Sequence, residues 1–102
     1  MIIYNVTCNV EAAISEKWQN WMKTTHIPEV MECGIFTSVK MHKVLSGNDG
    51  GDTFAIAYSC KSMKDFHQYQ IKHAPDLQKK HTERYGTKVV SFRTLLEEIE
   101  KF

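Results

Sequence analysis

Residues 2–8 alternate between apolar and polar positions with a period of two. One face carries the apolar side chains of Ile2, Tyr4, Val6 and Cys8, and the other carries Ile3, Asn5 and Thr7. Successive side chains of a β-strand point to opposite faces of the sheet. The pattern therefore predicts a strand with one buried face.

The next apolar positions repeat at the helical period. The stripe consists of Ile14, Trp18, Trp21, Met22 and Thr25, and Asn9 is the predicted N-cap. Pro28 has no backbone N–H and constrains Ile27 towards an extended conformation. We therefore expect an interruption at His26-Ile27-Pro28, followed by a short helical turn over residues 29–33 that stops at Gly34.

A β-hairpin is predicted next, from two strands at residues 35–45 and 53–60. The glycine-rich turn between them is Gly47-Asn48-Asp49-Gly50-Gly51-Asp52, whose residues tolerate positive φ angles. In the second strand one face carries Phe54, Ile56, Tyr58 and Cys60. That face is expected to be buried.

The second half repeats this plan. Ser62 is a predicted helix cap, and the apolar stripe behind it is Phe66, Tyr69, His73 and Leu77. His73-Ala74-Pro75 repeats the earlier interruption. A further helix over residues 76–85 ends at Gly86, and residues 88–96 form the last strand.

The order of elements predicts a single ferredoxin-like domain over residues 1–102. Its class is α+β, with a βαββαβ order and a four-stranded antiparallel sheet that has helices on one face. The other face would carry residues such as Ile3 or Val44, which is too apolar to remain fully exposed. We therefore expect a homodimer that packs sheet against sheet, a dimeric α+β barrel.

Composition narrows the possible partners and compartment. The formal net charge is +1, and no run of Lys or Arg longer than the Lys79-Lys80 pair occurs, so no nucleic-acid partner is expected. No stretch is apolar enough to span a membrane, and residues 1–6 lack the features of a signal peptide. Three widely spaced cysteines do not suit a secreted disulfide framework. The expected location is the cytoplasm.

Two motifs resemble a small bacterial family of unknown function. The first is Trp18-x2-Trp21-Met22-Lys23-x2-His26-Ile27-Pro28 followed by Gly34-x-Phe36. The second is His73-Ala74-Pro75-x-Leu77 with His81-x3-Tyr85-Gly86 and Phe92-Arg93-Thr94-Leu95. This resemblance implies a ferredoxin-like dimeric α+β barrel and brings no activity with it.

A looser resemblance is to the dimeric α+β barrel superfamily, including antibiotic-biosynthesis-type monooxygenases and haem-degrading relatives. The matching positions are Tyr58, Ser62, Phe66 and Tyr69. The haem-degrading members of this superfamily share a set of Asn, Trp and His residues. The similar positions in this chain are Asn5 and His81, but Tyr58 stands where the Trp would fall. The resemblance therefore does not imply haem cleavage, and fold alone implies no chemistry.

The candidate binding residues are His26, Tyr58, His81 and Arg93. His26 has the intrinsic pKa of a general base, although it can equally bond the end of a helix. His73 presents the same choice. His81 and Tyr85 lie one helical turn apart, so their side chains can meet on one face of the helix. They are either a pair that shares a proton in a cleft or a simple pair at the surface or the edge of the core.

Arg93 lies among apolar strand residues, where a guanidinium needs a partner. It can hold a carboxylate ligand through two hydrogen bonds, pair with Glu97 or a partner-chain acid, or point to solvent.

Neither a metal nor another cofactor is expected, because no ligand pair has metal-binding spacing and no phosphate loop is present. Cys8 and Cys60 end two strands that are predicted to be neighbours. Inert buried cysteines are the favoured interpretation, and a redox pair is the alternative.

Two hypotheses of function follow. One is a non-catalytic module that binds a small molecule or a partner. The other is a cofactor-independent enzyme, monooxygenase-like or isomerase-like, in which His26 or His81 is the base and Tyr58 or Arg93 orients the substrate. Catalysis requires several polar groups to converge on one pocket.

Overall fold

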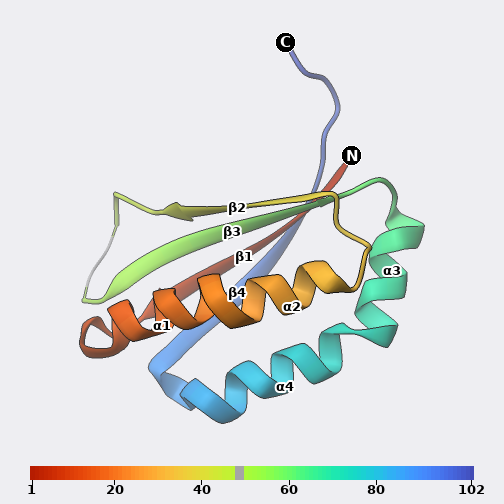
Figure 1. Ribbon diagram of the computed structural model, residues 1–102. Helices are drawn as coiled ribbons and strands as arrows, with labels where there is room; N and C mark the ends of the chain where they lie inside the picture. Colours follow the sequence, from red (N-terminus) through yellow and green to blue (C-terminus); the bar gives the residue numbers. More distant parts are fainter. Residues whose placement is uncertain (48–49) are drawn as a thin grey trace.

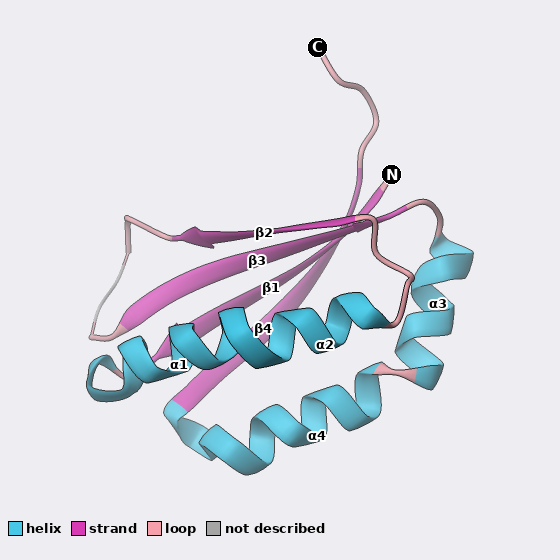
Figure 2. Cartoon of the chain, viewed as in Figure 1, coloured by secondary structure: helices cyan, strands magenta, loops and turns pink. Residues whose placement is uncertain are grey.

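A computed structural model describes residues 1–47 and 50–102. Its sheet has the strand order β2-β3-β1-β4 with every neighbouring pair antiparallel, and the helices cover one face (Figures 1 and 2). The strands are β1 Ile2–Val10, β2 Ser38–Lys43, β3 Asp52–Cys60 and β4 Val89–Glu97. The helices are α1 Ser15–Trp21, α2 Ile27–Glu32, α3 Met63–Lys72 and α4 Ala74–Tyr85. The predicted ferredoxin-like α+β fold is confirmed.

The two central strands bury the faces that their alternation predicts. In β1 the buried residues include Ile2, Tyr4 and Cys8, and the buried residues of β3 are Phe54, Ile56, Tyr58 and Cys60. Both faces lie beneath the helices, where Trp18 is fully buried. The core therefore lies between the central strands and the helical layer.

The register of β1 against β3 separates Cys8 from Cys60. Ile2 is the partner of Cys60 and Cys8 is the partner of Phe54, so the two cysteines lie at opposite ends of an antiparallel pair. At about 3.3 Å per residue, six residues correspond to roughly 20 Å. The register therefore excludes the redox-pair alternative, because the C-terminal ends of two antiparallel neighbours lie at opposite ends of the pair.

The first helical region is continuous where the sequence predicts a break. Helix α1 passes through a π-helical segment, Met22–His26, directly into α2. Pro28 lies in the first turn of α2, directly after the π-helical segment, so the chain remains helical across the proline. The predicted cap is also wrong, because Asn9 belongs to β1 and its side-chain amide donates to Thr53 Oγ1 at 2.9 Å.

The second His-x-Pro segment behaves as predicted. Helix α3 ends at Lys72 and α4 starts at Ala74, so the helical path changes direction there (Figure 2). Ser62 caps α3, because its hydroxyl accepts from the Asp65 N–H at 3.2 Å. Gly86 follows α4 with a φ of 54°, as the predicted helix end requires.

The predicted hairpin is present, with a shorter first strand. Strand β2 starts at Ser38 because Phe36 leaves the sheet edge to pack in the core. Of the predicted turn, Asn48 and Asp49 lie outside the described residues. Gly51 has a φ of 109°, and a Cβ there would lie 2.7 Å from the Val10 carbonyl oxygen. Only glycine allows this approach.

The face of the sheet opposite the helices is open. On β4 it exposes Val90, Phe92 and Leu96, whose partners on β1 are Asn9, Thr7 and Ile3. The exposed fraction of Phe92 is 62%. In the part of the chain that is described, no helix is long and apolar enough to cross a membrane.

Candidate functional site

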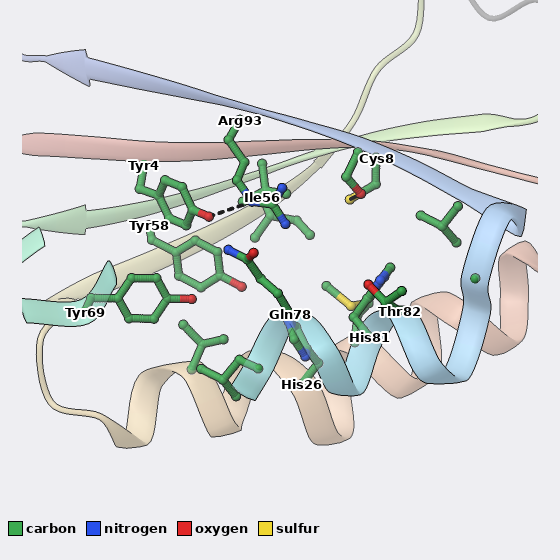
Figure 3. A pocket seen from close by; sticks show the side chains of 17 residues that line it. Tyr4, Cys8, His26, Ile56, Tyr58, Tyr69, Gln78, His81, Thr82 and Arg93 are labelled. Carbon is green, nitrogen blue, oxygen red and sulfur yellow. Dashed lines mark hydrogen bonds between the residues drawn. The ribbon is translucent and has the colours of Figure 1, made fainter. Parts of the chain in front are cut away.

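A cavity of about 230 Å³ lies between the sheet and the helices (Figure 3). All four predicted binding residues line it: His26 from the π-helical segment, Tyr58 from β3, His81 from α4 and Arg93 from β4. Exposed residues among its lining, Thr82 and Arg93, place its mouth between α4 and β4. The fold thus gathers residues that are far apart in the sequence.

Arg93 supplies the positive charge of the cavity. Its Nε donates to the Tyr4 hydroxyl oxygen at 2.9 Å (Figure 3). Among residues 1–47 and 50–102, no acidic side chain lines the cavity and none forms an ion pair with Arg93. The guanidinium therefore faces the cavity without a neutralising carboxylate, and its pairing with Glu97 is not observed.

Two buried tyrosines point their hydroxyls into the cavity. Tyr58 and Tyr69 are 3% and 4% exposed, and Figure 3 shows both phenols directed towards the interior, beside Gln78. Neither hydroxyl forms a hydrogen bond with a described residue. Burial raises the pKa of both groups, so they remain protonated donors. A buried hydroxyl without a partner is destabilising. A molecule in the cavity that forms hydrogen bonds with these two hydroxyls would therefore stabilise the folded protein.

A hydrogen bond from Trp18 determines which ring nitrogen of neutral His81 carries the proton. The indole N–H of Trp18 donates to His81 Nε2 at 3.0 Å. Because an acceptor nitrogen carries no hydrogen, the neutral imidazole of His81 has its proton on Nδ1. Burial, together with the charge of Arg93, lowers the pKa of His81. His81 is therefore a neutral donor at pH 7.

His26 lies beside His81 and is also neutral. Its ring stacks on Trp21 with centroids 5.1 Å apart, and the His81 centroid is 5.8 Å away. Burial lowers the pKa of His26 to about 4, with the neighbouring His81 acting in the same direction. No described residue forms a hydrogen bond with His26, so its nitrogens are available to a ligand.

Other candidates from the sequence lie outside this arrangement. His73 stacks on Tyr69 at 6.5 Å but does not line the cavity. The Asn5 amide bonds to Thr7 on the opposite face of the sheet. Tyr85 contacts His81 with ring centroids 5.5 Å apart, as the helical spacing predicts, yet it too is absent from the lining.

Cysteine and metal chemistry find little support. Cys8 lines the cavity, where burial raises its thiol pKa and the Ser91 hydroxyl donates to its sulfur at 3.3 Å. A thiol with a raised pKa is a poor nucleophile. Among the described residues, no group of three or more His, Cys, Asp or Glu side chains is placed to hold a metal ion.

Three polar residues that line the cavity are not among the binding candidates from the sequence: Tyr4, Tyr69 and Gln78. The first two lie on apolar stripes, where an aromatic residue indicates core packing. Gln78 lies three residues before His81 on α4, so helical spacing alone could have placed both side chains on one face. The register of β1 against β4 would have indicated the contact between Tyr4 and Arg93, because these two residues are diagonal neighbours on the adjacent strands.

The ferredoxin-like α+β fold of the chain is shared with solved structures of other proteins. The chain belongs to the family described as a domain of unknown function, DUF4286, whose model matches residues 1–99. No curated protein is significantly similar to it in sequence. The resemblance inferred from the two motifs is thus confirmed at the level of family and fold.

Three solved structures illustrate the fold. A putative antibiotic biosynthesis monooxygenase from Deinococcus radiodurans is 15% identical with a TM-score of 0.72, covering 100% of this chain and 96% of that one. A dimeric ferredoxin-like protein from an uncultured marine organism is 11% identical with a TM-score of 0.67, covering 99% and 97%. A mutant of MhuD with two manganese protoporphyrin IX molecules per active site is 11% identical with a TM-score of 0.72, covering 100% and 98%. At these identities they show the fold alone.

Proposed function

We propose that this protein binds a small oxygenated carboxylate, such as a 2-hydroxy or 2-oxo acid, in the cavity between sheet and helices. The observation that carries the proposal is the unneutralised guanidinium of Arg93 beside the unpaired hydroxyls of Tyr58 and Tyr69. A guanidinium suits a carboxylate geometrically. The phenols are donors for a further oxygen on the same ligand.

The size of the cavity supports a small ligand. Its volume is about 230 Å³, whereas sites for drug-sized ligands begin at roughly 300 Å³ and an engineered cavity of about 150 Å³ accepts benzene. Since His26 and His81 are neutral at pH 7, Arg93 alone sets the charge preference. A monoanion is therefore favoured.

Titration with 2-hydroxybutanoate and with its neutral amide tests this proposal. Backbone amide NMR shifts give the affinity of each for the wild-type protein. We expect the acid to bind and the amide to bind much more weakly. Arg93→Gln should weaken acid binding roughly 10- to 100-fold, because it removes a charge-assisted hydrogen bond.

Arg84→Gln is the matched control. Arg84 is exposed and lies over the Trp21 ring at 5.3 Å, outside the cavity lining, so its loss should leave acid binding unchanged. Equal binding of acid and amide, or equal loss in the two variants, rejects a carboxylate site at Arg93.

Catalysis is the second candidate, because the polar groups converge as an enzyme requires. His26 is a neutral imidazole that forms no hydrogen bond with any described residue, and Arg93 and Tyr58 line the same cavity, where they would orient a bound acid. With a 2-oxo acid, His26 would accept the C3 proton while the donors bind the enolate oxygen. Loss of the C3 proton signal of 2-oxobutanoate in D₂O, abolished by His26→Gln, supports this; exchange at the uncatalysed rate excludes it.

We further propose that two copies pair through the open sheet face, as a homodimer in the cytoplasm. The exposed side chains of Val90, Phe92 and Leu96 support the pairing, and three free cysteines suit a reducing compartment. Light scattering should give about twice the 11.8 kDa of one chain. Phe92→Lys should give the single mass, whereas Ile71→Lys, a charge placed on exposed α3, should not; a wild-type mass near one chain refutes the dimer.

A further inference from the structure

A second cavity of about 200 Å³ adjoins the first on the α3 side. The two cavities share four lining residues: Tyr4, Tyr69, Gln78 and Arg93. The 2.9 Å hydrogen bond between Arg93 and Tyr4 joins two of these shared residues, so it lies at the boundary where the two cavities adjoin, which we call the neck. A ligand held by Arg93 at the neck is adjacent to both cavities.

The second cavity has a different chemical character from the first. Its own side walls are Phe66 and Ala74, which are buried, and Leu95, which is 42% exposed. Gln70 and Thr94 are exposed and complete its lining. Apart from Arg93, none of its described lining residues is charged. Beyond the four shared residues, the second cavity adds the hydrocarbon of Phe66, Ala74 and Leu95 and no ionisable group. The first adds the Tyr58 hydroxyl and the imidazoles of His26 and His81 beside its aliphatic side chains.

We propose that the second cavity is a subsite for an apolar tail on the acid whose carboxylate binds Arg93. The ligand class is then a 2-oxygenated carboxylate with a hydrocarbon chain. Its oxygen atoms lie in the first cavity and its chain passes the neck to contact Phe66, Ala74 and Leu95. This inference rests on the proposed carboxylate site.

The volumes support a ligand that spans the neck. Each cavity is smaller than the roughly 300 Å³ at which sites for drug-sized ligands begin, whereas the two together lie within that range. Burial of hydrocarbon then adds affinity without any new polar contact. Each fully buried methylene should strengthen binding roughly fourfold.

The test compares 2-hydroxybutanoate, 2-hydroxyhexanoate and 2-hydroxyoctanoate, which share one head and differ only in tail length. Calorimetric or NMR titration of the wild-type protein should show affinity rising at least tenfold across the series. Leu95→Trp fills the second cavity, and strand alternation keeps the new side chain on the cavity face. In this variant, 2-hydroxybutanoate should bind as before while the gain with length disappears.

Ile71→Trp is the control. Ile71 is 77% exposed on α3, lines neither cavity and lies away from the sheet face proposed for dimerisation. It should retain the full dependence on tail length. Comparable circular dichroism spectra of both variants verify that the fold is intact.

The outcomes separate the two proposals. If 2-hydroxybutanoate binds through Arg93 but affinity does not rise with length, or Leu95→Trp keeps the rise, the tail subsite is wrong and the carboxylate site stands. If none of the acids binds the wild-type protein, both proposals fail.

Discussion

Acidification from pH 7 to pH 5 should destabilise the fold through His26. In the folded protein burial lowers the pKa of this imidazole from 6.5 to about 4. Above pH 6.5 the folded and unfolded chains both hold it neutral. Between 6.5 and 4 the unfolded chain binds a proton that the folded chain does not, so the free energy of unfolding falls as the pH falls.

The magnitude follows from the same two values. The whole shift corresponds to about 3 kcal/mol, since each pKa unit is worth about 1.4 kcal/mol. Between pH 7 and pH 5 the loss from His26 is about 2 kcal/mol, a large part of a typical domain stability of roughly 5–15 kcal/mol. His81 acts with the same sign, because its pKa is also lowered.

Urea denaturation at pH 7 and at pH 5, followed by circular dichroism, measures this loss. The comparison is with His26→Gln, whose side chain does not titrate and which should therefore lose about 2 kcal/mol less than the wild-type protein. His67→Gln removes an exposed imidazole and should keep the wild-type loss. Equal losses in the wild-type protein and His26→Gln would refute the reasoning.

Three further substitutions test the contacts of the site and the fold. Tyr58→Phe should leave the free energy of unfolding of the ligand-free protein unchanged or raise it by about 1 kcal/mol, because it removes a buried hydroxyl that bonds to no described residue. Tyr4→Phe loses the Arg93 bond and should instead cost about 1 kcal/mol; equal costs in urea denaturation contradict this. Trp18→Phe removes the donor to His81 Nε2, so an NMR titration should show the His81 pKa rising; an unchanged pKa denies that the indole contributes. Ser62→Ala removes the α3 cap and should destabilise by about 1 kcal/mol, against no change in urea denaturation if the cap is dispensable.

The sheet could be predicted because its central strands have one buried face. Alternation in β1 and β3 shows directly which side chains face the helices, and the antiparallel order follows from the element sequence. The same topology already separated Cys8 from Cys60, since the end of one strand meets the start of the next. The alternative of a Cys8–Cys60 redox pair could therefore have been excluded from the antiparallel topology alone.

The first helix and the cavity could be predicted only in part. A π-helical segment differs from an α-helix by one backbone residue, so the apolar stripe cannot distinguish a break at Pro28 from continuity through His26. Arg93 stood out because a charge interrupts an apolar strand. Tyr69 did not, because a tyrosine on an apolar stripe indicates core packing whether or not its hydroxyl finds a partner.

A crystal structure of the protein grown with 2-hydroxybutanoate tests the central claim most directly. We expect the carboxylate within about 3 Å of the Arg93 guanidinium, with the 2-hydroxyl oxygen accepting a hydrogen bond from Tyr58 or Tyr69. No second ligand molecule should occupy the rest of the cavity. A cavity occupied only by water, at a ligand concentration that saturates the NMR titration, would contradict the account.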